Sequence, residues 1–183
     1  RKWYLIMREL ETRHRLEREV TRQAAGILMD IYQERVGFLD GAEEGLGEMK
    51  GSGTELGIVT HAAKKWTWMK YNWLRLDRFI GWDDVFIVNP NGHKTAKSWE
   101  EACRYFRVKP RNVVMVGDSP RSDINPALEI GVPPSQCFLI ETDKRWTIHN
   151  QEVNPEVRRV KNLLEVVGVG AEILNDFHPR LVG

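Results

Sequence analysis

The chain has 183 residues, which fits one domain or a core domain with a small appendage. Hydrophobic residues make up 42% of it and charged residues 29%, a balance that is typical of a globular protein and excludes a disordered or membrane-embedded one. The formal net charge of +1 gives no whole-chain attraction to nucleic acid or to an anionic membrane surface, so we expect neither as a partner.

The first 36 residues carry a helical pattern. Apolar residues from Trp3 to Ile31 recur at steps of three, four and seven, which marks one face of a helix. Between them, residues 8–19 alternate in charge sign, which indicates a solvated helix face and not a nucleic-acid patch. We expect one long helix or a helix pair over residues 1–36.

After Gly37 the pattern changes to short apolar runs separated by helical segments. Four runs have the length of strands, at residues 56–59, 85–88, 113–116 and 137–140. Helical periods lie between and after them, at residues 62–76, 95–107, 122–130, 154–170 and 171–177. Alternating strands and helices predict an α/β fold with a doubly wound parallel sheet that is buried on both faces. We assign residues 37–183 to this core domain.

Polar residues follow three of these runs, where parallel α/β sheets gather their functional groups. Thr60 and His61 follow the first run, Lys94 follows the loop after the second, and Asp118 and Asp123 follow the third. A hydroxyl and backbone N–H groups donate to phosphate oxygens, and a lysine adds positive charge. Carboxylates bind a hard cation such as Mg²⁺. The sequence therefore predicts a site for a phosphate together with a divalent cation.

Each of these residues also has a simpler explanation when it is taken alone. Thr60 could cap a helix, and Lys94 could be an ordinary surface lysine. Asp123 could cap the helix that follows it, and His61 could be a polar loop residue, since nothing pairs with it at metal-ligand spacing. Their order on successive strand ends favours a site.

These segments resemble the haloacid-dehalogenase-like (HAD) superfamily. The strand before Thr60, Lys94 at the start of a helix, and the run Val-Val-Met-Val-Gly-Asp-Ser-x-x-x-Asp that ends at Asp123 are similar to the family's second, third and fourth motifs. The resemblance covers residues 38–142. It implies a Rossmann-like α/β core.

The sequence departs from the family pattern at two of these motifs. Lys94 is followed by Thr95 where members often carry proline, and Lys97 is an alternative for the site lysine. His61 follows Thr60 where asparagine is frequent. We favour Lys94 because its spacing to the fourth motif is closer to that of the family, and we expect Thr60, His61 and Lys94 to bind the phosphate.

The resemblance implies a phosphohydrolase that acts on a small phosphomonoester. In the family, an aspartate on the first strand attacks phosphorus and forms an aspartyl-phosphate, and a second aspartate two residues later acts as acid and then base. Thr60 would hold a phosphoryl oxygen, and Lys94 would neutralise charge between nucleophile and phosphate. Asp118 would bind Mg²⁺ directly, and Asp123 would support the metal, its waters or Lys94.

The family's first motif, Asp-x-Asp after an apolar strand, occurs nowhere in the 183 residues. Asp40 precedes a glycine but follows no strand, and we predict that it caps a helix at residues 42–48. In the family the missing strand lies in the middle of the sheet, so its absence would leave two strands with unpaired edges. We therefore expect a fragment that is inactive alone, in which residues 1–36 are part of a helical cap over the site.

Two other functions stay open. A non-catalytic relative would keep the HAD fold as a phosphate-binding or protein-interaction module and hydrolyse nothing. A phosphoacceptor regulator needs an acidic pair after its first strand, which is also absent. The lysine and the paired carboxylates favour Mg²⁺ phosphoryl chemistry over metal-free dehalogenation.

The remaining signals indicate a cytoplasmic protein. No apolar run approaches the ~20 residues that span a bilayer, and the first nine residues contain too short an apolar stretch for a secretion signal. Cys103 and Cys137 form neither a CxxC pair nor a disulfide framework, and we predict buried reduced thiols. We predict packing positions, and not a platform for stacking bases, for Trp66, Trp68, Trp73 and Trp99.

Overall fold

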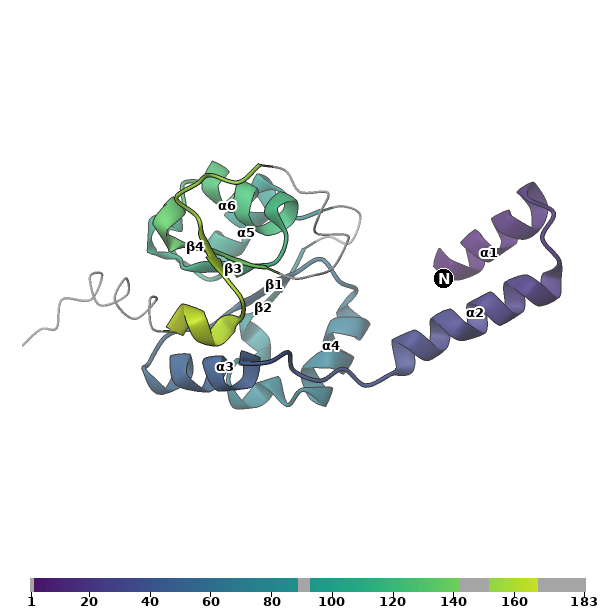
Figure 1. Ribbon diagram of the computed structural model, residues 1–183, viewed down its shortest axis with the longest axis horizontal. Helices are drawn as coiled ribbons and strands as arrows, with labels where there is room; N and C mark the ends of the chain where they lie inside the picture. The colour runs from purple at the N-terminus through teal and green to yellow at the C-terminus, as the bar shows by residue number, and fades with distance from the viewer. Residues whose placement is uncertain (1, 89–92, 142–151, 168–183) are drawn as a thin grey trace, which may run out of the picture. The chain divides into compact units, whose positions relative to one another are not determined.

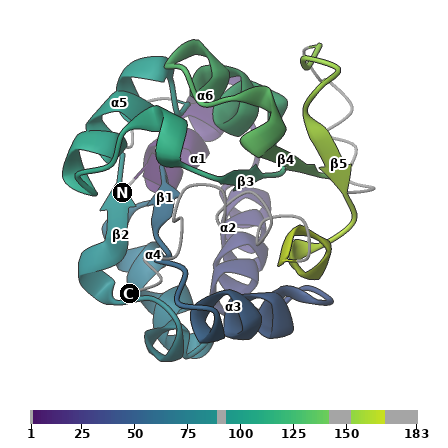
Figure 2. The ribbon, with the colours of Figure 1, turned by 90° about the vertical axis from the view of Figure 1, so that its left-hand side faces the viewer.

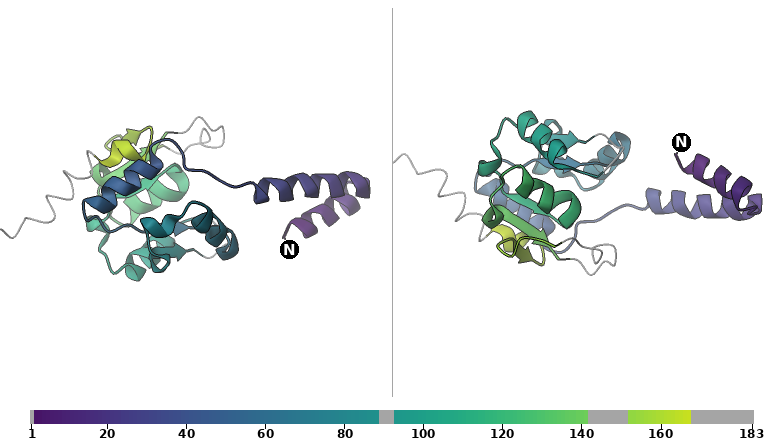
Figure 3. Two further views of the ribbon diagram at one scale, coloured as in Figure 1. Left: turned by 90° about the horizontal axis from the view of Figure 1, so that it is seen from below. Right: turned by 90° about the horizontal axis from the view of Figure 1, so that it is seen from above.

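The computed structural model describes residues 2–88, 93–141 and 152–167, and the chain forms two compact units, Arg1–Val36 and Gly37–Gly183. The first unit is a pair of helices, α1 (Lys2–Arg13) and α2 (Arg18–Gln33), which lie side by side (Figures 1 and 3). Thr21 of α2 is buried and donates to the Glu11 carboxylate of α1 at 2.5 Å. The expected helix pair is confirmed, whereas a cap role for it stays a prediction.

In its described residues, the second unit contains five strands in two parallel sheets. They are β1 (Ile58–Thr60), β2 (Val85–Ile87), β3 (Met115–Gly117), β4 (Cys137–Ile140) and β5 (Arg158–Val160). Strand β1 pairs with β2, while β3, β4 and β5 form a second sheet in that order, and every pair is parallel. The predicted α/β class with a parallel sheet is confirmed.

Helices cover the strands on two sides. In Figure 2, α5 (Ala96–Tyr105) and α6 (Asn125–Glu129) lie on one side, and α3 (Ala42–Gly51) and α4 (Lys64–Trp73) lie on the other. Short 3-10 helices and one π-helix complete the unit, at Leu76–Arg78, Trp82–Asp84, Pro110–Asn112, Pro120–Ile124 and Pro134–Gln136.

The core consists of two clusters, one on each face of the β3–β4–β5 sheet. The first joins α5 and α6 to the strands through Trp99, Ala127 and Leu139. The second joins Phe138 of β4 to Val160 of β5, with Met49 of α3 packed against it. Because neighbouring residues of β4 point to opposite faces, one apolar strand serves both clusters, as expected for a sheet that is buried on both sides.

The predicted helix over residues 154–170 is wrong in its first half. Residues 158–160 form β5, which pairs with β4, and only residues 163–167 are helical in the described part of this segment. Val153, Val157, Val160 and Leu164 follow one another at steps of four, three and four, which imitates a helical face. Pairing with β4 overrides that local pattern because it satisfies backbone groups along an otherwise open edge. The helix predicted at residues 171–177 lies outside the described residues.

The predicted helix cap at Asp40 is also wrong. Helix α3 has Gly41 as its N-cap, and no side chain makes the capping hydrogen bond. Gly41 adopts a φ of 72°, in the left-handed region that glycine reaches without strain, so the backbone itself turns the chain into the helix.

Both cysteines are buried and free, as predicted. Burial raises the pKa of the Cys137 thiol to about 12 and also raises the pKa of Cys103. Both thiols are therefore protonated at neutral pH and unsuited to act as nucleophiles.

In the part of the chain that the structure describes, no helix combines the length and the apolar character needed to cross a membrane. The cytoplasmic location and the absence of a nucleic-acid partner stay predictions.

Candidate functional site

Lys94 connects the ends of two strands that belong to different sheets. It lies just before α5, and its ammonium group forms an ion pair with the carboxylate of Asp123. The two side chains are only 13% and 7% exposed. The same ammonium donates to the backbone carbonyl of Val59 in β1 at 3.4 Å. The structure thus brings the carboxyl end of β1 next to the segment that follows β3.

The turn that carries Asp123 is held by its own polar groups. It is a π-helix, Pro120–Ile124, a rare element that is frequent at functional sites. The Ser119 hydroxyl accepts from the N–H of Ser122 at 3.2 Å. In return, Oδ2 of Asp123 accepts from the N–H of Ser119 at 3.2 Å. Oδ1 forms the ion pair with Lys94 and has no hydrogen-bond partner, so this buried carboxylate is held by one hydrogen bond and one ion pair.

Glycine at position 117 allows Asp123 to lie against β3. A Cβ added to Gly117 would overlap the side chain of Asp123. A glycine is therefore needed at this position of the Gly-Asp-Ser run, because the Asp123 carboxylate lies so close to the strand.

We predict that Gly117→Ala displaces Asp123 and lowers the free energy of unfolding by about 1–3 kcal/mol, the usual cost of overpacking. Urea denaturation measures the loss. The matched control is Gly51→Ala at the end of α3, where a Cβ meets no atom within 4 Å. The control should be neutral or slightly stabilising. Equal stability of the two variants would contradict the close approach.

Asp118 and Thr60 flank this ion pair at the strand ends. Asp118 follows β3 directly and is half-buried, and within the described residues no hydrogen bond or ion pair reaches its carboxylate. The Thr60 hydroxyl accepts from the N–H of Ala62 at 3.2 Å, which leaves its own proton available to a ligand. Thr60 is not the cap of α4, because the N-cap of that helix is Ala63.

Two other predicted residues lie apart from the ion pair. His61 is exposed, and no contact of its side chain is found in the described part of the chain. Lys97 is exposed on α5, whereas Lys94 is the lysine that contacts Asp123. The geometry therefore favours Lys94 over Lys97 as the site lysine.

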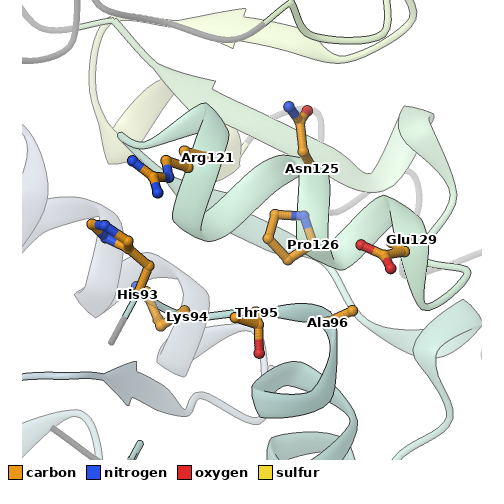
Figure 4. A pocket seen from close by; sticks show the side chains of 8 residues that line it. All are labelled: His93, Lys94, Thr95, Ala96, Arg121, Asn125, Pro126 and Glu129. Atoms are coloured by element: carbon orange, nitrogen blue, oxygen red, sulfur yellow. The ribbon is translucent and has the colours of Figure 1, made fainter. Parts of the chain in front are cut away.

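A pocket of about 370 Å³ borders Lys94 on the side of α6. Figure 4 shows residues of the α5 entry facing residues of the π-helical turn and α6 across it. Basic side chains contribute to it from both sides, namely His93 and Lys94 from one and Arg121 from the other, and Glu129 lies at its far end. The pocket is therefore mixed in charge, with basic groups on the side of the ion pair.

No group of three or more His, Cys, Asp or Glu side chains is arranged to hold a metal ion within residues 2–88, 93–141 and 152–167. Mg²⁺ does not require such a cage, because it keeps several waters and commonly takes one or two carboxylates together with phosphate oxygens. The oxygen donors of Asp118 fit this manner of binding.

Trp99 is the residue near this site that sequence reasoning assigned only to packing. It is buried, its indole N–H donates to the backbone carbonyl of Ser122 at 3.0 Å, and its ring centroid lies 5.5 Å from the Lys94 ammonium. Its position five residues after the site lysine is the only sequence signal for this proximity. The bond to Ser122 spans 23 residues and depends on the fold.

One curated relative is a phosphatase. The chain is 35% identical over 94 residues to a glyceraldehyde 3-phosphate phosphatase from Pyrococcus furiosus. The aligned part covers 50% of this chain and 38% of the relative, so the chain spans well under half the length of that protein.

Two solved structures are similar in fold. A haloacid dehalogenase-like family hydrolase from Xanthomonas campestris matches with a TM-score of 0.72 and 17% identity, over 94% of this chain and 66% of that one. A HAD phosphatase from Thermococcus onnurineus matches with a TM-score of 0.57 and 19% identity, over 91% of this chain and 87% of that one. At these identities the likeness concerns the fold alone.

A family model described as haloacid dehalogenase-like hydrolase matches residues 5–135, which is most of the chain and includes every predicted site residue. The parallel strands agree with that match. Predicted site residues lie at or after the ends of these strands, namely Thr60, Lys94, Asp118 and Asp123. The chain therefore belongs to the haloacid dehalogenase-like hydrolase family.

Proposed function

We propose that this chain forms the core of a Mg²⁺-dependent phosphohydrolase that acts on a small phosphomonoester. The observation that carries the proposal is the buried Lys94–Asp123 ion pair, which joins the end of β1 to the turn after β3 in which Asp118 is the first residue. The partial identity to a glyceraldehyde 3-phosphate phosphatase supports a phosphorylated substrate.

Each polar group has a role that its surroundings suit. The Thr60 hydroxyl, with its proton available, donates to a phosphoryl oxygen. Lys94 supplies positive charge to the phosphate, and the largely buried setting strengthens that attraction. Since Asp123 is held by one hydrogen bond and one ion pair, it acts mainly by holding Lys94 in place. His61 adds at most its backbone N–H to phosphate binding, because its side chain is exposed.

Asp118 is the residue that would hold Mg²⁺. Its carboxylate is half-buried and has no partner among the described residues, which is the state expected of an anionic ligand available to a cation. When bound, Mg²⁺ would neutralise charge on the phosphate oxygens. Asp118, the first residue after β3, would hold the cation at that end of the strand.

The nucleophile in this proposal is a carboxylate on a strand that lies between β1 and β3. In the described residues β1 pairs only with β2, and β3 pairs only with β4. Thr60 O accepts from Val88 N on the β2 side. Successive residues of a strand direct their backbone groups to alternate sides, so the Val59 carbonyl points to the open edge, where Lys94 contacts it. A strand paired there would end beside Lys94 and Asp118, and its aspartate would form the aspartyl-phosphate.

A second candidate is a non-catalytic phosphate-binding or protein-interaction module. One observation favours it: the 183 residues contain no Asp-x-Asp sequence to supply the nucleophile and the acid–base group. The two candidates differ in turnover and share the phosphate site.

The test is phosphate release by the complete gene product. The purified protein is incubated with p-nitrophenyl phosphate and with small phosphomonoesters, glyceraldehyde 3-phosphate among them, in MgCl₂ or in EDTA. We expect release in MgCl₂, loss of release in EDTA, and recovery when Mg²⁺ is restored. Binding of inorganic phosphate without any turnover would select the non-catalytic module, and a codon sequence that contains no Asp-x-Asp strand would agree with it.

A further inference from the structure

Trp99 contacts Lys94 and the backbone of Ser122, the residue that precedes Asp123 in the chain. It lies in the first turns of α5, is only 6% exposed, and belongs to the core cluster between α5, α6 and the β3–β4–β5 sheet. Its indole N–H reaches the turn that carries Asp123, and the face of its ring lies near the Lys94 ammonium. Among the described residues, Trp99 is the aromatic residue that forms a cation–π contact with Lys94.

The indole N–H donates to a backbone carbonyl that cannot accept the hydrogen bond of an α-helix, which comes from the N–H four residues later. The carbonyl of Ser122 is followed four residues later by Pro126, which has no N–H to donate in an α-helical pattern. The Trp99 indole donates to this carbonyl at 3.0 Å, with both residues buried. The Ser122 carbonyl and the Asp123 N–H belong to one peptide unit, so the indole fixes the peptide that leads into Asp123.

The indole ring limits where the Lys94 ammonium can lie. The ammonium has three N–H donors, and the Asp123 carboxylate occupies one of their directions. The ring centroid of Trp99 lies 5.5 Å from the nitrogen, within the range of a cation–π contact.

We propose that Trp99 is a positioning residue for the Lys94–Asp123 pair. Its N–H holds the Asp123 turn, and its ring holds the Lys94 ammonium, so one rigid side chain keeps both charges at the strand ends. The role rests on the proposed phosphohydrolase function. Trp99 touches neither substrate nor metal in this role and acts through Lys94 and Asp123.

The first test separates the two contacts in the complete gene product. Trp99→Phe keeps a ring face and loses the N–H donor, whereas Trp99→Leu loses both. We expect kcat to fall on the order of 10-fold for Trp99→Phe and further for Trp99→Leu, with KM nearly unchanged, as for other residues that orient catalytic groups. The matched control is Trp68→Phe on α4, where the tryptophan is 45% exposed and packs on Tyr71 and Trp82. The control should keep the wild-type kcat.

The kcat of each variant is measured at a temperature well below its thermal unfolding midpoint, so that it reports activity per folded molecule. A lower midpoint with an unchanged kcat in Trp99→Phe and Trp99→Leu would reduce Trp99 to a core residue and overturn the proposal. If the wild-type protein releases no phosphate from any phosphomonoester, the proposed function is refuted. This outcome differs from failure of the Trp99 proposal, in which the wild type is active and the Trp99 variants match it.

The second test does not depend on turnover. Amine acetylation followed by mass spectrometry measures the labelling rate of Lys94, with the exposed Lys97 as an internal reference. We expect Lys94 to be slow in the wild type and several-fold faster in Trp99→Leu, while Lys97 is unchanged. An unchanged Lys94 rate in folded Trp99→Leu would overturn the positioning role whether or not the protein is an enzyme.

Discussion

Asp118→Asn should lower the Mg²⁺-dependent turnover of the complete gene product by at least about 100-fold, or about 3 kcal/mol of activation free energy. Asparagine keeps the size of the side chain and removes its charge, and a hard cation binds a neutral amide oxygen more weakly than a carboxylate. The variant should fold normally, since no described hydrogen bond or ion pair depends on the Asp118 side chain. Steady-state kinetics over a range of MgCl₂ concentrations measure the effect.

The matched control for this variant is Asp83→Asn. Asp83 is exposed in a 3-10 helix before β2, and its backbone carbonyl, which accepts from the Tyr105 hydroxyl, is unaffected by the change. The control should retain wild-type turnover and Mg²⁺ dependence. Normal turnover in Asp118→Asn would remove Asp118 from the metal site.

Lys94→Met should abolish detectable turnover and also destabilise the fold by about 3 kcal/mol. The charge that the phosphate needs is lost, and Asp123 is left as a buried carboxylate without its cationic partner. Methionine nearly matches the length and apolar stem of lysine, so the loss reports charge and not volume. Phosphate release and urea denaturation measure the two effects on one preparation. Lys97→Met, which changes an exposed lysine of α5, should alter neither.

The double variant Lys94→Met/Asp123→Asn separates stability from activity. It removes the unpaired buried charge, so we expect much of the lost unfolding free energy to return while turnover stays absent. An equally unstable double variant would show that the Lys94–Asp123 pair contributes little to the fold. Turnover that returned in the double variant would show that Lys94 has no direct part in catalysis.

The local sequence predicts most of the elements that carry the site. Four apolar runs predict strands, of which β4 matches its bounds and the others differ by a few residues. The Gly-Asp-Ser run places Asp118 and Asp123 after β3, and the fold gives that spacing a reason, because Gly117 lets Asp123 approach the strand. These features depend on short-range patterns of apolar, glycine and turn residues.

The misses arise where distant partners override local preference. Residues 158–160 have helical spacing to their apolar neighbours, yet they form β5 because β4 offers an edge to pair with. Residues 122–130 were expected to form one helical segment, yet a π-helix over residues 120–124, tied to Ser119 and to Trp99, precedes the α-helix. Neither β4 nor Trp99 lies close enough in the sequence for a local pattern to reveal its contact with these residues.

The sequence by itself determined the α/β class, the order of the first four strands and the helices between them, and which polar residues follow the strand ends. These follow from periodicity and residue type, which act over a few residues. Only the tertiary structure decided that Lys94 pairs with Asp123, that Lys97 does not, and that Trp99 joins the two segments. Those choices depend on contacts between residues about 5 to 30 apart in the chain, which form only when the strands and helices pack together.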